Sequence, residues 1–272
     1  MPRGEVSGYG YEVHTLGQGP RQIMALHCGL ARGMSYTGIA EVLGEGVTLT
    51  APDLPGHGQS DPWVGQGDYS AIAVAIAEAA APEGTFDLIG HSWGAVLSLA
   101  YAVRHPERVR SVTLFEPVLF ALAKADGRPE GAQNDRDFEP AYLALEADDP
   151  VEATRVFTSK WGGSVTWEAI PERSRAYMVE RMHTILAGGP LLHEDAGGIL
   201  APGALGQITA PVLLIEGARS PAVAGAILDG LEARLPQSKR VVIPEAAHMA
   251  PITRAGEVGG HIRDFLRGIP VD

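Results

Sequence analysis

The sequence has a single cysteine among 272 residues and no long uninterrupted apolar run. Cys28 cannot form a disulfide within the chain, which agrees with a reducing compartment. No stretch approaches the roughly 18 consecutive apolar residues that a membrane helix needs. The first residues, MPRGEVSGYG, lack the apolar core of a secretory signal. We therefore expect a cytoplasmic protein with no membrane partner.

Basic residues are also scarce, with 21 Lys and Arg against 33 Asp and Glu and a formal net charge of −12. A field of this sign repels phosphate backbones and anionic membrane surfaces, so we expect no nucleic-acid partner. Hydrophobic residues make up 45% and charged residues 20% of the chain, which is ordinary for a globular protein. The length allows one large domain or one domain that carries a lid.

Apolar runs bounded by turn residues alternate with segments of helical periodicity, which indicates an α/β fold with a mostly parallel sheet. Strand character is absent from residue 117 to about residue 207. We therefore predict a helical lid over 118–207, inserted into a core made of 1–117 and 208–272. The expected strands are 23–27, 47–50, 86–89, 109–115, 211–216 and 240–243, and the expected helices are 34–43, 69–80, 93–104, 223–234 and 256–267.

One expected strand runs through Gly90-His91-Ser92-Trp93-Gly94 directly into a helix. This is the context of a nucleophile elbow, in which a serine on a strained turn needs neighbours without bulk. The backbone N–H of Trp93 would lie at the helix N-terminus, where orphan donors and the helix dipole can stabilise an oxyanion. We predict that Ser92 is a nucleophile and that Trp93 supplies an oxyanion-hole donor.

Four motifs in order resemble the α/β-hydrolase fold superfamily over nearly all of the core. They are His27-Cys28-Gly29, the run DLPGHGQSD at 53–61, the elbow, and Glu245-Ala246-Ala247-His248-Met249. The resemblance implies a mostly parallel, doubly wound sheet with the lid after the sixth strand, and no cofactor. Asp53 and Asp61 would hold turns through bonds from side chain to backbone.

The resemblance also implies roles for two further positions. His248 would be the general base that takes the Ser92 proton and returns it to the leaving group. The second oxyanion donor would come from the loop after the third strand. Gly29 is our choice, although Cys28 replaces the commoner glycine and leaves open which of the two N–H groups is presented.

The acid of the triad departs from the commonest pattern. Ser220 occupies the place where most relatives have an aspartate, and a hydroxyl has no charge to stabilise an imidazolium. Some relatives place the acid one strand earlier, where this chain has Glu116 in Leu114-Phe115-Glu116-Pro117. We predict Glu116 as the acid, with a hydrogen bond at the lid hinge as its alternative role. Glu216 is the next candidate.

The predicted lid is rich in aromatic and thioether side chains, which could roof an apolar pocket with few charges or pack the lid on the core. We expect no metal site, because the sequence has neither H-E-x-x-H nor paired cysteines. The lid residues in question are Phe138, Tyr142, Phe157, Trp161, Trp167, Tyr177, Met178, Met182 and His183.

The leading functional hypothesis is a serine hydrolase that acts on a small or medium, largely apolar ester, or on a related acyl or carbon–carbon bond. Two alternatives stay open. One is a cofactor-free perhydrolase or acyltransferase that uses the same triad, and the other is a hydrolase-like protein that binds a small molecule with vestigial turnover. The expected partner is a small-molecule substrate, and the expected state is a monomer or homodimer.

Overall fold

The computed structural model describes residues 3–163 and 165–271. Its centre is an eight-stranded sheet with strand order β1-β2-β4-β3-β5-β6-β7-β8. β1 and β2 pair antiparallel, as do β2 and β4, and every other pair in the sheet is parallel. The strands are β1 Arg3–Val6, β2 Tyr9–Gly17, β3 Arg21–Leu26, β4 Val47–Pro52, β5 Phe86–His91, β6 Val109–Phe115, β7 Val212–Gly217 and β8 Ser238–Ile243.

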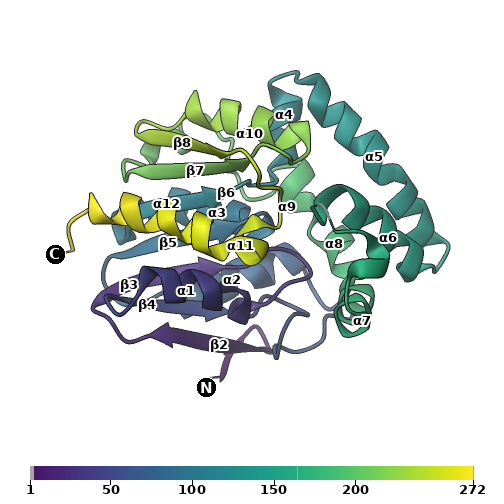
Figure 1. The fold of residues 1–272 in the computed structure, drawn as a ribbon, viewed down its shortest axis with the longest axis horizontal. Helices are drawn as coiled ribbons and strands as arrows, with labels where there is room; N and C mark the ends of the chain where they lie inside the picture. The colour runs from purple at the N-terminus through teal and green to yellow at the C-terminus, as the bar shows by residue number, and fades with distance from the viewer. Residues whose placement is uncertain (1–2, 164, 272) are drawn as a thin grey trace.

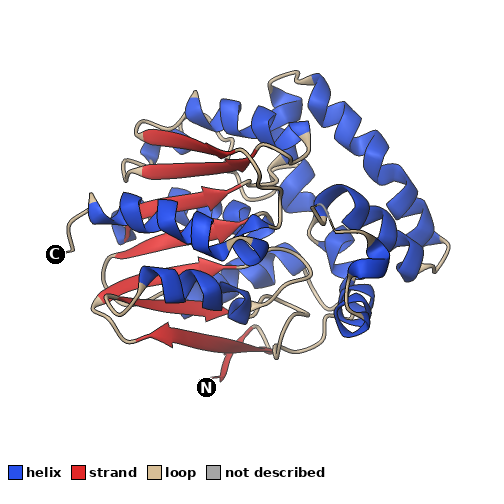
Figure 2. Cartoon of the chain, viewed as in Figure 1, coloured by secondary structure: helices blue, strands red, loops and turns tan. Residues whose placement is uncertain are grey.

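Helices cover both faces of the sheet (Figures 1 and 2). α1, α11 and α12 lie over one face and α2, α3 and α10 over the other. The helices of these two layers are α1 Thr37–Leu43, α2 Tyr69–Ala80, α3 Trp93–Arg104, α10 Ala222–Glu232, α11 Ala250–Thr253 and α12 Ala255–Arg267. Short 3₁₀ turns occur at Gly33–Tyr36, Pro106–Arg108, Trp167–Ala169 and Leu205–Gln207.

Side-chain alternation along the strands divides the core between the two faces. In β3, Ile23 and Ala25 join the cluster under α1 and α12, whereas Met24 and Leu26 join the cluster under α2, α3 and α10. Successive residues of a strand point to opposite faces, so a strand covered on both sides is mostly apolar. The central strands are buried along most of their length, and the buried polar side chains within β5 and β6 include Asp87, Ser111 and Thr113.

The described residues between β6 and β7 form six α-helices, which lie at the end of the molecule where the parallel strands finish (Figure 1). They are α4 Phe120–Ala125, α5 Pro129–Glu146, α6 Pro150–Trp161, α7 Glu172–Arg181, α8 His183–Ala187 and α9 Gly189–His193. Asp149 caps the N-terminus of α6, because its carboxylate accepts the backbone N–H of Glu152 at 2.9 Å, and Pro150 is in the first turn. We call α4–α9 the helical insertion.

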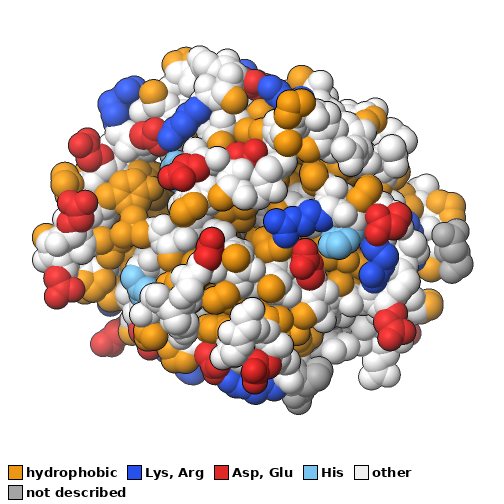
Figure 3. Space-filling model, turned by 180° about the vertical axis from the view of Figure 1, so that it is seen from behind, with side chains coloured by type: hydrophobic (Ala, Val, Ile, Leu, Met, Phe, Trp, Pro, Cys, Tyr) orange, Lys and Arg blue, Asp and Glu red, His pale blue; other side chains and the backbone are white. Residues whose placement is uncertain are grey.

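The observed elements agree with the alternation read from the sequence, and the hydrolase-type sheet is confirmed. The pattern of apolar runs did not reveal β1 and β2. β1 is an edge strand of four residues with no buried position, and the nine residues of β2, which pairs with both β1 and β4, include Glu12, His14 and two glycines among the apolar residues. Acidic side chains are spread over the end of the molecule that carries the insertion (Figure 3). In the described part of the chain, no helix is both long enough and apolar enough to cross a membrane.

Candidate active site

Ser92 lies between β5 and α3 in a backbone conformation that L-residues rarely adopt, with φ = 57° and ψ = −116°. The two glycines of the motif make this turn sterically possible. A Cβ on Gly94 would overlap the carbonyl oxygen of Leu26, and one on Gly90 would overlap the Cα of Ala95. The elbow is therefore a site of local strain held by close packing of α3 on the sheet.

Glu116 directly follows β6 and is completely buried, again at a positive φ of 44°. Its Oε1 accepts the backbone N–H of Gly217 at 2.6 Å, and its own N–H donates to the carbonyl of Ile215 at 3.1 Å. Both partners belong to β7, the neighbouring parallel strand. The carboxylate is thus fixed at the carboxyl ends of two strands.

His248 lies on the loop between β8 and α11 and donates from Nδ1 to the Oε2 of Glu116 at 2.7 Å. The pair is 132 residues apart in the sequence, and only 5% of the His248 side chain is exposed. With Nδ1 protonated, Nε2 of the neutral ring is available to accept a proton. This is the arrangement in which a carboxylate fixes the tautomer of a base.

Glu216 and Ser220, the other two groups considered as partners of His248, have no bond to it among the described residues. Glu216 pairs with Arg240 through two hydrogen bonds, and a Cβ on Gly225 of α10 would lie 2.8 Å from its Oε1. The buried Oγ of Ser220 has no hydrogen-bond partner within the described residues. Of the three candidates, the structure joins Glu116 to His248.

His91 connects the elbow to the loop of His248. Its Nε2–H donates to the His248 carbonyl oxygen at 2.7 Å, and the two rings lie 5.0 Å apart. Burial, with a contribution from His248, holds the His91 pKa well below its usual value. His91 is therefore a neutral positioning residue, a role that the sequence did not indicate.

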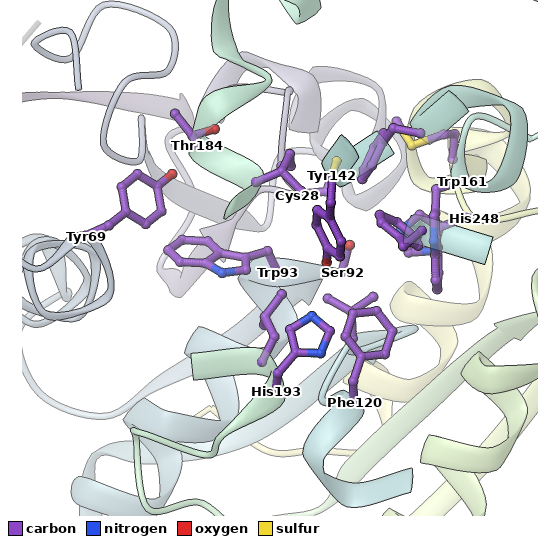
Figure 4. A pocket seen from close by; sticks show the side chains of 17 residues that line it. Cys28, Tyr69, Ser92, Trp93, Phe120, Tyr142, Trp161, Thr184, His193 and His248 are labelled. Atoms are coloured by element: carbon purple, nitrogen blue, oxygen red, sulfur yellow. The ribbon is translucent and has the colours of Figure 1, made fainter. Parts of the chain in front are cut away.

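Ser92 and His248 both line one cavity of about 60 Å³ (Figure 4). In that view Ser92 stands between Trp93 and His248. The indole of Trp161, from α6, packs edge-on against the His248 ring with centroids 4.4 Å apart. No Asp, Glu, Lys or Arg is among the described residues that line the cavity. Its wall is mainly aromatic and aliphatic.

The helical insertion contributes some of its predicted aromatic residues to this wall and not others. Phe138, Tyr142, Phe157 and Trp161 line the cavity. The other five residues have packing contacts, which is the alternative role left open by the sequence. Tyr177 donates to Ala31 O and accepts from Gly58 N, His183 bonds Trp63 O, Met178 and Met182 pack near Leu30, and Trp167 stacks under Arg175.

Sequence reasoning missed several lining residues. Met249 lies in the motif of His248, and the others belong to no motif: Tyr69, Val118, Phe120, Thr184, Ile185, Leu192 and His193.

Backbone donors for an oxyanion lie on the same cavity. Gly29 and Trp93 both line it, and within the described residues neither N–H donates to a turn or loop acceptor. Trp93 is the first residue of α3, where the N–H has no acceptor within the helix. Cys28 also lines the cavity, but burial raises the pKa of its thiol to about 12. A thiol held in this state is a poor nucleophile.

Two buried histidines hold the loops that carry Gly29. His57 Nδ1–H donates to Pro55 O at 2.8 Å and its Nε2 accepts Leu30 N–H at 3.0 Å. His27 does the same between Cys28 O and Leu54 N. Burial lowers the pKa of both rings, that of His57 to about 3. Protonation would place a second N–H against a backbone donor, so each ring has to stay neutral.

This arrangement predicts a loss of stability in mild acid. The folded pKa of His57 lies below its unfolded value near 6.5, so the unfolded chain binds the proton more readily. The free energy of unfolding therefore has its full value above about pH 6.5. It falls as the pH drops toward 3, by up to about 1.4 kcal/mol per pH unit for one ring. Urea unfolding at pH 7, 6 and 5 measures the slope. The His57→Gln side chain keeps an acceptor and does not titrate. The free energy of unfolding of this variant should therefore depend less steeply on pH, by the equivalent of about one proton. Equal slopes in the variant and the wild type would contradict a neutral, buried His57.

Asp53 and Asp61 take the structural roles expected of them. Asp53 accepts the backbone N–H groups of Gly33 and Gln59 and bonds His14 at 2.9 Å. Asp61 accepts the N–H of Gly10 at 2.8 Å and pairs with Arg3. In the described part of the chain, no three His, Cys, Asp or Glu side chains are grouped so that they could hold a metal ion.

Comparison with known proteins identifies the family. The sequence model of the alpha/beta hydrolase fold family matches residues 23–255. A pimeloyl-[acyl-carrier protein] methyl ester esterase of Neisseria meningitidis serogroup B (strain H44/76) is 29% identical over 227 residues, covering 81% of this chain and 83% of that protein. The dihydrolipoyllysine-residue acetyltransferase component of the acetoin cleaving system of Cupriavidus necator is 27% identical over 238 residues. That match covers 83% of this chain but only 58% of the relative.

Among solved structures, the haloalkane dehalogenase DatA from Agrobacterium tumefaciens C58 superposes with a TM-score of 0.75 at 20% identity. The match covers 99% of this chain and 96% of that one. At this identity the likeness shows the shared fold alone, because one fold supports many reactions. The chain belongs to the alpha/beta hydrolase fold family and is a hydrolase enzyme.

Proposed function

We propose that this protein is a serine esterase for small or medium, largely apolar esters, with Ser92 as nucleophile, His248 as base and Glu116 as acid. The observation that carries the proposal is the buried bond of 2.7 Å from His248 Nδ1 to Glu116 Oε2 beside the cavity that Ser92 shares. A relative named as a methyl ester esterase supports the reaction class. We also propose that residues 118–207 act as a lid over a core of 1–117 and 208–272.

Each residue has a defined step in this mechanism. Ser92 Oγ attacks the ester carbonyl carbon while its proton passes to His248 Nε2, and the carbonyl oxygen becomes an oxyanion between the N–H groups of Gly29 and Trp93. The imidazolium, stabilised by Glu116, then gives its proton to the departing alcohol. In the second step His248 takes a proton from water, whose oxygen attacks the acyl carbon. The bond to Ser92 Oγ then breaks, His248 returns the proton to Ser92, and the carboxylic acid leaves. The mainly apolar wall strengthens each of these electrostatic interactions.

Mass spectrometry of the intact protein after exposure to a fluorophosphonate tests the proposal without knowledge of the substrate. The wild-type chain should gain a single adduct, because the probe reacts only with an activated serine. Ser92→Ala should gain none, and Cys28→Ala should still be labelled, which separates the serine from the neighbouring thiol. A wild-type protein that is folded by thermal melting yet unlabelled would favour a small-molecule binding protein instead.

A further inference from the structure

A second, outer hollow adjoins the candidate active-site cavity. The inner cavity, about 60 Å³, holds Ser92 and His248, whereas the outer groove, about 620 Å³, is open and has charged as well as apolar residues in its lining. The two have only Tyr142 and His193 in common among the described residues that line them. A cavity of about 60 Å³ has room for only a short chain, so the longer side of an ester would extend beyond it.

Tyr142 and His193 each have one side toward the apolar interior and one toward the groove. The His193 ring lies on Phe120 of the inner cavity with centroids 4.9 Å apart, and its Nδ1 is 3.9 Å from Asp135 Oδ1 in the groove. Tyr142 packs against Phe138 inside, and burial together with Asp135 raises its pKa. Both side chains are half-buried, and they come from different helices, α5 and α9.

We propose that Tyr142 and His193 form the constriction between groove and cavity and determine which esters are hydrolysed. The short apolar side of the ester lies in the inner cavity, and the longer side passes between these two rings into the groove. Figure 4 shows both side chains at the cavity, with His193 beside Phe120. This inference rests on the proposed esterase function and adds the class of substrate, an ester with one short apolar side and one extended side that ends in a neutral or cationic group.

The charges of the groove define the chemistry of that extension. Two cations, Lys124 and Arg136, face three acids, Asp135, Glu139 and Glu194. Lys124 pairs with Asp135 at 3.1 Å, and Arg136 donates to the Gln133 amide oxygen at 2.7 Å. Within the described residues, neither Glu139 nor Glu194 forms an ion pair with Lys or Arg. The groove therefore favours a neutral or cationic extension over an anionic one.

Selectivity for ester length tests the constriction. Two substrate series are needed, p-nitrophenyl esters with acyl chains from two to twelve carbons and butyrates of alcohols of the same lengths. The readout is the ratio of kcat/KM for the eight-carbon member to that for the four-carbon member. One of the two series places its lengthened side in the groove. In that series Tyr142→Ala and His193→Ala should each raise this ratio at least fivefold, because each removes a ring from the constriction.

Two control variants make the result specific. Leu143→Ala changes the next residue of α5, which is 57% exposed and lines neither hollow, and should keep the wild-type ratio within twofold. Tyr142→Phe keeps the ring, so its length ratio should rise less than that of Tyr142→Ala. Unchanged ratios in both alanine variants, with Ser92 still labelled by the fluorophosphonate, would overturn the constriction. If the fluorophosphonate does not label the folded wild-type protein, the esterase function itself is overturned.

The charge preference has its own measurement. The substrates are esters of equal length whose lengthened side enters the groove and ends in a carboxylate, a hydroxyl or a trimethylammonium group. The carboxylate should have the lowest kcat/KM, at least fivefold below the other two, and the double variant Glu139→Gln, Glu194→Gln should reduce that difference. A wild-type preference for the carboxylate would overturn this part of the proposal.

Discussion

Replacing Glu116 by Gln is expected to lower kcat/KM for ester hydrolysis by about 10⁴-fold. The amide has nearly the same shape, but it has no charge to stabilise the imidazolium that His248 becomes in the transition state. Its NH₂ group can also face Nδ1 and force the wrong tautomer. Steady-state kinetics on a p-nitrophenyl ester measure the effect, and retention of activity within about tenfold of the wild type would remove Glu116 from the triad.

The neighbouring strand offers matched controls for this result. Glu216→Gln removes a carboxylate that is engaged by Arg240 and should leave the rate within a few-fold of wild type. Ser220 follows the same strand, at the position where the resemblance places the acid. The double variant Glu116→Gln, Ser220→Asp should recover at least tenfold over Glu116→Gln alone. No recovery would mean that the β7 loop does not bring position 220 within reach of His248.

Replacing His248 by Gln is expected to reduce kcat by about 10⁴- to 10⁶-fold, the largest effect after loss of the nucleophile. Without an imidazole, nothing accepts the Ser92 proton during attack or returns it to the alcohol. Fluorophosphonate labelling should slow together with ester hydrolysis, because both depend on the same activation of Ser92. Single-turnover kinetics and the labelling rate are the two measurements.

A second histidine variant separates this effect from general loss of an imidazole. His261 lies on α12 and lines no part of the cavity, so His261→Gln should have wild-type rates. His248→Gln should also melt within a few degrees of the wild type, since the change leaves the elbow and the sheet untouched. Wild-type turnover by a folded His248→Gln protein would require a different base and would contradict the mechanism.

Three features of this protein follow from residues that are close together in the sequence. The elbow is such a case, because Gly90 and Gly94 are needed where α3 approaches the sheet, and both lie within two residues of Ser92. The central strands are another, since burial on both faces demands continuous apolar runs. The motif around His248 is a third, because it follows the last strand within a few residues and so places the histidine at the carboxyl edge of the sheet.

Tertiary structure decided which distant groups meet. Glu116, Glu216 and Ser220 all lie near strand ends, and only the pairing of β6 with β7 and the path of the β8–α11 loop directs Glu116 to His248 across 132 residues. The cavity wall has the same origin, because Phe120, Leu192 and His193 have no motif and become neighbours of Ser92 only when the insertion packs on the core. Sequence periodicity reports which face of an element is buried, but it contains no information about which buried faces meet. The contact of Glu116, the acid predicted from the resemblance, with His248 and the shape of the pocket therefore depend on long-range packing, whereas the turn that carries Ser92, the proposed nucleophile, is local.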